Sequence, residues 1–142
     1  MHFKNRIVLF YLNLTWDIIF MISRSLLVVD DEKLVRWSIQ ETMGREHFKV
    51  VSASDGTDAI EKIHQERFDV IITDLVMPGR NGIDVARQAK KLHPDTKVIM
   101  ITAYGSTLDK EEARNAGVSF FLDKPFQVDE VKRAVSQVLS AA

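Results

Sequence analysis

Four charged side chains and one hydroxyl in this sequence could do chemistry together. Asp30 and Asp31 are adjacent after the apolar run LLVV, and Asp74 closes the run VIITD. Three carboxylates brought together would bind a hard cation through oxygen, and a donor set without His or Cys favours Mg²⁺. Lys124 and Thr102 would add an ammonium and a hydroxyl for phosphoryl oxygens. These residue types indicate phosphate chemistry, in which an ionised aspartate is a nucleophile that needs no general base.

The elements that must position these side chains are apolar runs that alternate with amphipathic segments. The expected strands are residues 26–29, 49–54, 70–74, 97–103 and 119–123. Near-continuous runs rich in Val and Ile are typical of strands that helices cover on both faces, and therefore of a parallel sheet. The alternation predicts a single doubly wound α/β domain, built from five right-handed strand–helix units.

The residues that could do chemistry all fall at or near the carboxyl ends of these strands. Ligands bind at that edge in doubly wound sheets. Each residue alone has an ordinary explanation, because an Asp at such a junction is often only a helix cap and a Lys is usually a solvated charge. Their common edge is what favours a functional site.

The bulk composition fits one globular domain and argues against several classes. The chain has 142 residues, of which 46% are hydrophobic and 27% charged. A net charge of −1 with scattered basic residues argues against direct nucleic-acid binding. The absence of cysteine excludes disulfides, thiolate zinc sites and cysteine nucleophiles. It also fits a reducing compartment, so we expect a cytoplasmic protein.

Residues 1–22 differ from the rest of the chain. They begin with basic residues and continue as an apolar run, as a signal peptide or membrane anchor would. However, Asn13, Thr15 and Asp17 interrupt this run, which is shorter than the roughly 20 apolar residues of a spanning helix. We interpret the segment as an extension outside the domain, in keeping with an upstream start codon, and expect no association with a membrane. The domain itself is placed at residues 23–142.

Four motifs resemble the receiver domain of two-component response regulators. They are LLVVDDE, VIITDLVMPGRNG, VIMITAYG and FLDKPF, in the order and at the spacing of that family. The resemblance implies a five-stranded sheet of order 2-1-3-4-5 with helices on both faces. It implies a signalling switch that takes a phosphoryl group from a sensor histidine kinase or a phosphotransfer protein. No enzyme activity is implied beyond slow self-catalysed phosphotransfer and dephosphorylation, and a homodimer that forms on phosphorylation is compatible with it.

The resemblance also implies a role for each residue of the site. Asp74 would be the phosphoacceptor, and Lys124 would pair with the phosphoryl group. Asp31 would bind Mg²⁺ directly and Asp30 mainly through water. The backbone carbonyl of Val76 would complete the protein ligands of the metal.

A switch and its readout are implied as well. Thr102 would close onto the phosphoryl group, and Phe121, where many relatives have Tyr, would turn inward with it. This movement would change the surface around the last two helices and so control a partner. The peptide bond between Lys124 and Pro125 would be cis.

The helix after DDE suggests where the phosphodonor docks. At about 100° per residue, the helix buries the face of Ile39 and Met43, so Trp37 lies nearly opposite and Leu34 well off that face. A surface tryptophan is common enough. An apolar docking patch beside the site explains it equally well, and Tyr104 would add to this patch near the mouth of the site.

Other classes remain to be compared with this interpretation. An aspartyl-phosphate phosphatase needs a second aspartate two residues after its nucleophile, and Val76 stands there. A flavin-binding protein of similar fold needs a small polar loop after the first strand, where this chain has acids that would repel FMN. The motifs suit the receiver of a longer transcription regulator and also a single-domain phosphorelay carrier, so both stay open.

Overall fold

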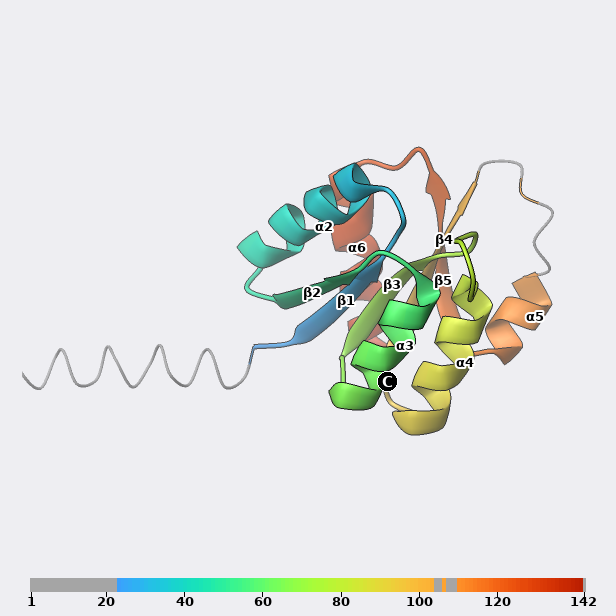
Figure 1. The fold of residues 1–142 in the computed structure, drawn as a ribbon. Coiled ribbons are helices and arrows are strands. Elements are labelled where there is room, and N and C mark those ends of the chain that lie inside the picture. Colours follow the sequence, from blue (N-terminus) through green and yellow to red (C-terminus); the bar gives the residue numbers. More distant parts are fainter. Residues whose placement is uncertain (1–22, 104–105, 107–109, 142) are drawn as a thin grey trace, which may run out of the picture.

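The computed structural model describes residues 23–103, 106 and 110–141, and the chain folds there into a parallel sheet between two helical layers (Figure 1). The strand order is β2-β1-β3-β4-β5. The strands are β1 (Ser25–Val29), β2 (Lys49–Ala53), β3 (Val70–Asp74), β4 (Lys97–Ala103) and β5 (Val118–Lys124). The predicted fold class and strand order are confirmed, and the fifth strand is one residue longer at each end than predicted.

Five helices in the described part of the chain cover the two faces of the sheet. They are α2 (Lys33–Arg45), α3 (Gly56–Gln65), α4 (Gly82–Leu92), α5 (Lys110–Asn115) and α6 (Val128–Ser140). Figure 1 shows α2 and α6 on one face of the sheet and α3, α4 and α5 on the other. No helix in this part of the chain is both long and apolar enough to cross a membrane.

The central strand β1 explains why its apolar run is continuous. Leu26 and Val28 pack in the cluster on the side of α2 and α6. Leu27 and Val29 pack in the other cluster, on the side of α3, α4 and α5. Successive side chains of a strand point to opposite faces, so a strand covered on both faces must be apolar at every position. After Ser25, which is only partly buried at the start of β1, the next polar side chain is Asp30, where the strand ends.

The turn into α4 holds the end of β3 in place. Asn81 Oδ1 accepts a hydrogen bond from Asp84 N, and Asn81 N donates to Asp84 Oδ2, which together form a capping box. Gly82, the first residue of α4, packs against the backbone carbonyl of Asp74 so closely that a Cβ there would overlap it. This contact couples the start of α4 to the aspartate that closes β3.

Candidate functional site

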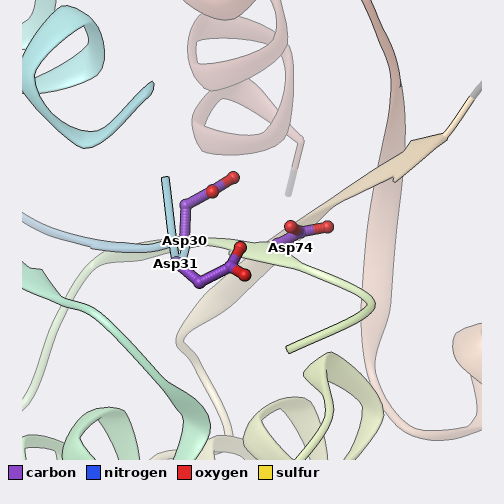
Figure 2. A group of neighbouring side chains, drawn as sticks. All are labelled: Asp30, Asp31 and Asp74. Carbon is purple, nitrogen blue, oxygen red and sulfur yellow. The ribbon is translucent and has the colours of Figure 1, made fainter. Parts of the chain in front are cut away.

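Asp30, Asp31 and Asp74 meet at the carboxyl edge of the sheet (Figure 2). One carboxylate oxygen of each residue lies within 4.8 Å of the others. The two strands are adjacent and parallel, with Val29 of β1 opposite Thr73 of β3. The residues that follow this pair therefore arrive at the edge together. The structure brings together the three carboxylates that the sequence predicted to converge.

Asp30 is wholly buried, although it stands at the edge of the sheet. Its Oδ1 accepts a hydrogen bond of 2.8 Å from Glu32 N, and its backbone carbonyl accepts one of 2.8 Å from Arg36 Nη1. Its Oδ2 lies 3.2 Å from Lys124 Nζ but has no partner in hydrogen-bond geometry within the described residues. Burial raises the pKa of Asp30 above its usual range, and the nearby charge of Asp74 adds to the rise.

Asp74 is buried as well, with 8% of its surface exposed. Burial raises the pKa of its carboxyl, and the charge of the exposed Asp31 raises it further. Lys124 and a backbone hydrogen bond from Val76 oppose this rise without cancelling it. The metal-free site therefore holds more negative charge than its surroundings solvate well.

Lys124 is the counter-charge at the centre of the site. Its Nζ lies 3.0 Å from Glu32 Oε1, 3.2 Å from Asp30 Oδ2 and 3.3 Å from Asp74 Oδ2. Burial alone would lower the pKa of Lys124, but the hydrogen bond to Glu32 and the charges of Asp30 and Asp74 outweigh it, so the pKa is raised. The peptide bond from Lys124 to Pro125 is cis, as the resemblance implied.

Glu32 is a member of the site that the sequence analysis did not assign. Its position directly after Asp31 was the available signal. Its side chain is 62% exposed, and its contact with Lys124 joins residues 92 positions apart in the chain. A contact between residues so far apart in the chain is made by the tertiary structure, and a local sequence pattern does not reveal it.

The two expected switch residues lie on neighbouring strands, β4 and β5. Thr102 is 2% exposed, and its hydroxyl donates a 2.9 Å hydrogen bond to Asp123 Oδ1, a contact that the sequence did not predict. Phe121 is half-buried, with Lys110 Nζ 5.3 Å and Arg114 Cζ 5.5 Å from its ring centroid. Both cations come from α5, so the aromatic ring connects β5 to that helix.

The structure describes two of the three residues expected to dock the phosphodonor. Leu34 and Trp37 of α2 are exposed, at 77% and 58%. Tyr104 lies outside the described residues. A groove of about 480 Å³ runs beside the site, and Trp37 is not among its lining residues. It is lined by Glu32, Leu34, Val35, Ser38, Ala103, Lys124, Pro125 and Phe126.

The donor set of this edge fits a hard divalent cation. The acidic cluster offers only oxygen ligands, and hydrogen bonds leave one of them, Asp30 Oδ2, unsatisfied in a buried position. Asp31 and Val76 are exposed, so the cluster is open to solvent on their side. Mg²⁺ suits such a site because it retains several waters and binds through a few carboxylates.

Comparison with known proteins agrees with this geometry. The family model of the response regulator receiver domain matches residues 26–136. The sporulation initiation phosphotransferase F of Bacillus subtilis (strain 168) is 30% identical over 119 residues, which make up 84% of this chain and 96% of that protein. The chain therefore belongs to the receiver domains of response regulators, a family of phosphorylation-dependent signalling domains.

Solved structures show the same fold. The chemotaxis response regulator CheY4 of Vibrio cholerae matches with a TM-score of 0.76 and 29% identity, over 82% of this chain and 99% of that one. A CheY-like receiver domain protein of Methanospirillum hungatei JF-1 matches with a TM-score of 0.78 and 26% identity, over 82% and 94%. The described domain thus has the extent of a whole receiver domain.

Proposed function

We propose that this chain is a phosphorylation-dependent switch in which Asp74 accepts a phosphoryl group. The donor would be a sensor histidine kinase or a phosphotransfer protein. The observation that carries the proposal is the position of Asp74, whose carboxylate lies within 4.8 Å of those of Asp30 and Asp31 and 3.3 Å from Lys124 Nζ. A nucleophile, anionic metal ligands and a cation for the phosphoryl oxygens are thereby within reach of one another.

The transfer step follows from these groups. A carboxylate oxygen of Asp74 attacks the phosphorus, and a P–O bond forms as the P–N bond to the donor imidazole breaks. The electron pair of the broken bond stays on the imidazole nitrogen. Lys124 exchanges part of its contact with Asp74 for a phosphoryl oxygen. The surrounding burial, which raises the pKa of Asp74, also excludes water from the buried side of the acceptor.

The metal in this proposal is Mg²⁺, which Asp31, Asp74 and the backbone carbonyl of Val76 would hold, with Asp30 bound to it mainly through water. When bound, it would neutralise the carboxylates and polarise the phosphoryl oxygens. Asp30 contributes a buried oxygen, Oδ2, that forms an ion pair with Lys124 but has no hydrogen-bond partner among the described residues. Asp31 is exposed, so an ion that enters from solvent would reach this carboxylate first.

Docking of the phosphodonor is assigned to the groove and the exposed apolar residues of α2. Leu34 lines the groove together with Lys124, so a donor seated there would approach the acceptor directly. Trp37 extends the apolar surface along α2. Helical donors commonly bind such grooves through apolar side chains.

The output side of the proposal rests on Thr102 and Phe121. Thr102 would turn to the phosphoryl group and Phe121 would follow, changing the surface around α5 and α6. Lys110 and Arg114 lie over the Phe121 ring, so a movement of the ring would alter contacts of α5. We assign the chain no turnover of its own beyond slow self-catalysed transfer and hydrolysis, and we place it in the cytoplasm, as its lack of cysteine led us to expect.

The experiment that tests the proposal is labelling with acetyl phosphate and Mg²⁺, read by intact mass spectrometry as phosphate that is labile to acid and to hydroxylamine. The parent chain should be labelled, and Asp74→Asn should not. Asp95→Asn removes an exposed carboxylate near the opposite edge of the sheet and should be labelled like the parent. Undiminished labelling of Asp74→Asn would overturn the assignment of the phosphoacceptor.

A further inference from the structure

The hydroxyl of Thr102 donates a hydrogen bond to a side chain of the neighbouring strand β5. Thr102 and Asp123 face each other across the ladder between β4 and β5. Thr102 Oγ1 donates to Asp123 Oδ1 at 2.9 Å. Thr102 is buried whereas Asp123 is exposed, so the hydroxyl points from the core towards a carboxylate that water can also reach.

A threonine hydroxyl carries a single proton and donates one strong hydrogen bond at a time. A hydroxyl bonded to Asp123 therefore cannot also donate to a phosphoryl oxygen on Asp74. The bond to a carboxylate is charge-assisted, and so it is stronger than one to a neutral acceptor. Movement of Thr102 towards the phosphoryl group must break it, and water then solvates the exposed carboxylate.

The position of Asp123 on β5 places it close in sequence to two residues of the proposed function, Phe121 and Lys124. It lies two residues after Phe121 on β5, so the two side chains project from the same face of the strand. It also directly precedes Lys124, whose ammonium contacts Asp74. One short segment of β5 thus carries the hydroxyl acceptor, the aromatic ring and the active lysine.

We infer that Asp123 is a positioning residue that holds the hydroxyl of Thr102 away from the phosphoryl site and so stabilises the unphosphorylated conformation. The inference rests on the proposed function. A group that binds only one of two conformations shifts their equilibrium by its differential free energy. Removal of the Asp123 carboxylate should therefore favour the conformation that binds a phosphoryl group.

The test is the affinity for beryllofluoride, a phosphoryl mimic, measured with Mg²⁺ by NMR titration of the full chain. Asp123→Ala should bind beryllofluoride roughly three- to tenfold more tightly than the parent, in keeping with the loss of one charge-assisted hydrogen bond. Asp123→Asn keeps an oxygen acceptor and should lie closer to the parent. If Asp123→Asn and Asp123→Ala were equally changed, charge and not the hydrogen bond would be responsible, and the inference would fail.

A second background separates positioning from a purely structural role. Thr102→Val keeps the shape of the side chain and removes the hydroxyl, so Asp123→Ala should change the affinity little in that background. An equal gain in both backgrounds would overturn the inference. Glu61→Ala removes an exposed charge from α3 and should match the parent.

The outcomes also distinguish this inference from the proposed function. A parent chain that binds beryllofluoride and is labelled at Asp74, together with an Asp123→Ala variant of unchanged affinity, would refute the role of Asp123 alone. A parent chain that neither binds beryllofluoride nor is labelled would refute the proposed function, and the role of Asp123 with it. In the variant without ligand, NMR signals of β4 and β5 should already shift towards their positions in the beryllofluoride complex.

Discussion

Lys124 Nζ lies 3.2 Å from Oδ2 of Asp30, a buried carboxylate oxygen that has no hydrogen-bond partner among the described residues. The ammonium is thus the counter-charge for the most deeply buried acid of the site. The same ammonium is the group that the proposed function moves towards a phosphoryl oxygen. Folding of the metal-free site and phosphotransfer consequently depend on one side chain.

Replacing Lys124 should make this dependence measurable. Lys124→Met leaves Asp30 buried without its counter-charge and should lower the free energy of unfolding in EDTA by about 2 kcal/mol, somewhat less than for a fully buried pair. Mg²⁺ should restore more stability to this variant than to the parent, because a cation replaces the missing charge. Urea unfolding with and without Mg²⁺ measures both effects. Lys49→Met, which breaks an exposed ion pair with Glu66, should change stability by less than about 1 kcal/mol.

Asp31→Asn should stabilise the chain in EDTA, whereas Lys124→Met should destabilise it. The charge of Asp31 raises the pKa of Asp74, so the two carboxylates repel each other in the absence of metal. Removing this charge should raise the melting temperature in EDTA by about 2 °C and reduce the shift that Mg²⁺ produces. Differential scanning calorimetry in EDTA and in Mg²⁺ measures both the melting temperature and its shift. An unchanged melting temperature together with an unchanged metal shift would show that Asp31 neither repels Asp74 nor binds the ion.

The buried carboxylates should make stability depend on pH. Burial raises the pKa of Asp74 above its ordinary value of 3.8, so the folded chain holds this proton more tightly than the unfolded chain does. The contribution of the Asp74 carboxyl to the free energy of unfolding in EDTA should consequently fall as the pH rises from about 4 through the raised pKa. Asp74→Asn lacks the group, so its stability relative to the parent should increase over the same range. Urea titrations in EDTA between about pH 4 and pH 8 measure this difference, and a difference independent of pH would contradict it.

The exposed tryptophan of α2 gives a prediction about the donor. Trp37→Ala should slow phosphotransfer from a phosphorylated histidine kinase or phosphotransfer protein by about tenfold, which is the loss of one good apolar contact at an interface. Labelling by acetyl phosphate, which needs no docking surface, should stay unchanged. Leu92→Ala removes an exposed apolar side chain from α4 and should leave both rates unchanged. Equal loss of rate with both donors would show that Trp37 supports the fold and not docking.

Much of the fold could be predicted from the residues alone. Continuous apolar runs indicated covered parallel strands, and amphipathic segments between them indicated helices on both faces, because burial depends on the local pattern. The order of the strands depended on the resemblance to a family, since strands of similar composition can be arranged in more than one order. The convergence of Asp30, Asp31 and Asp74 followed from the rule that parallel strands end at one edge.

The sequence by itself determined which acids, which hydroxyl and which lysine reach the edge of the sheet. Only the tertiary structure decided what each of them contacts: Glu32 shares Lys124 with the aspartates, and Asp123 accepts the hydroxyl of Thr102. Local patterns report which face of an element is buried, and that is a property of neighbouring residues. Hydrogen-bond partners on different strands depend instead on register, turn geometry and rotamers. These are defined only when the whole sheet has formed.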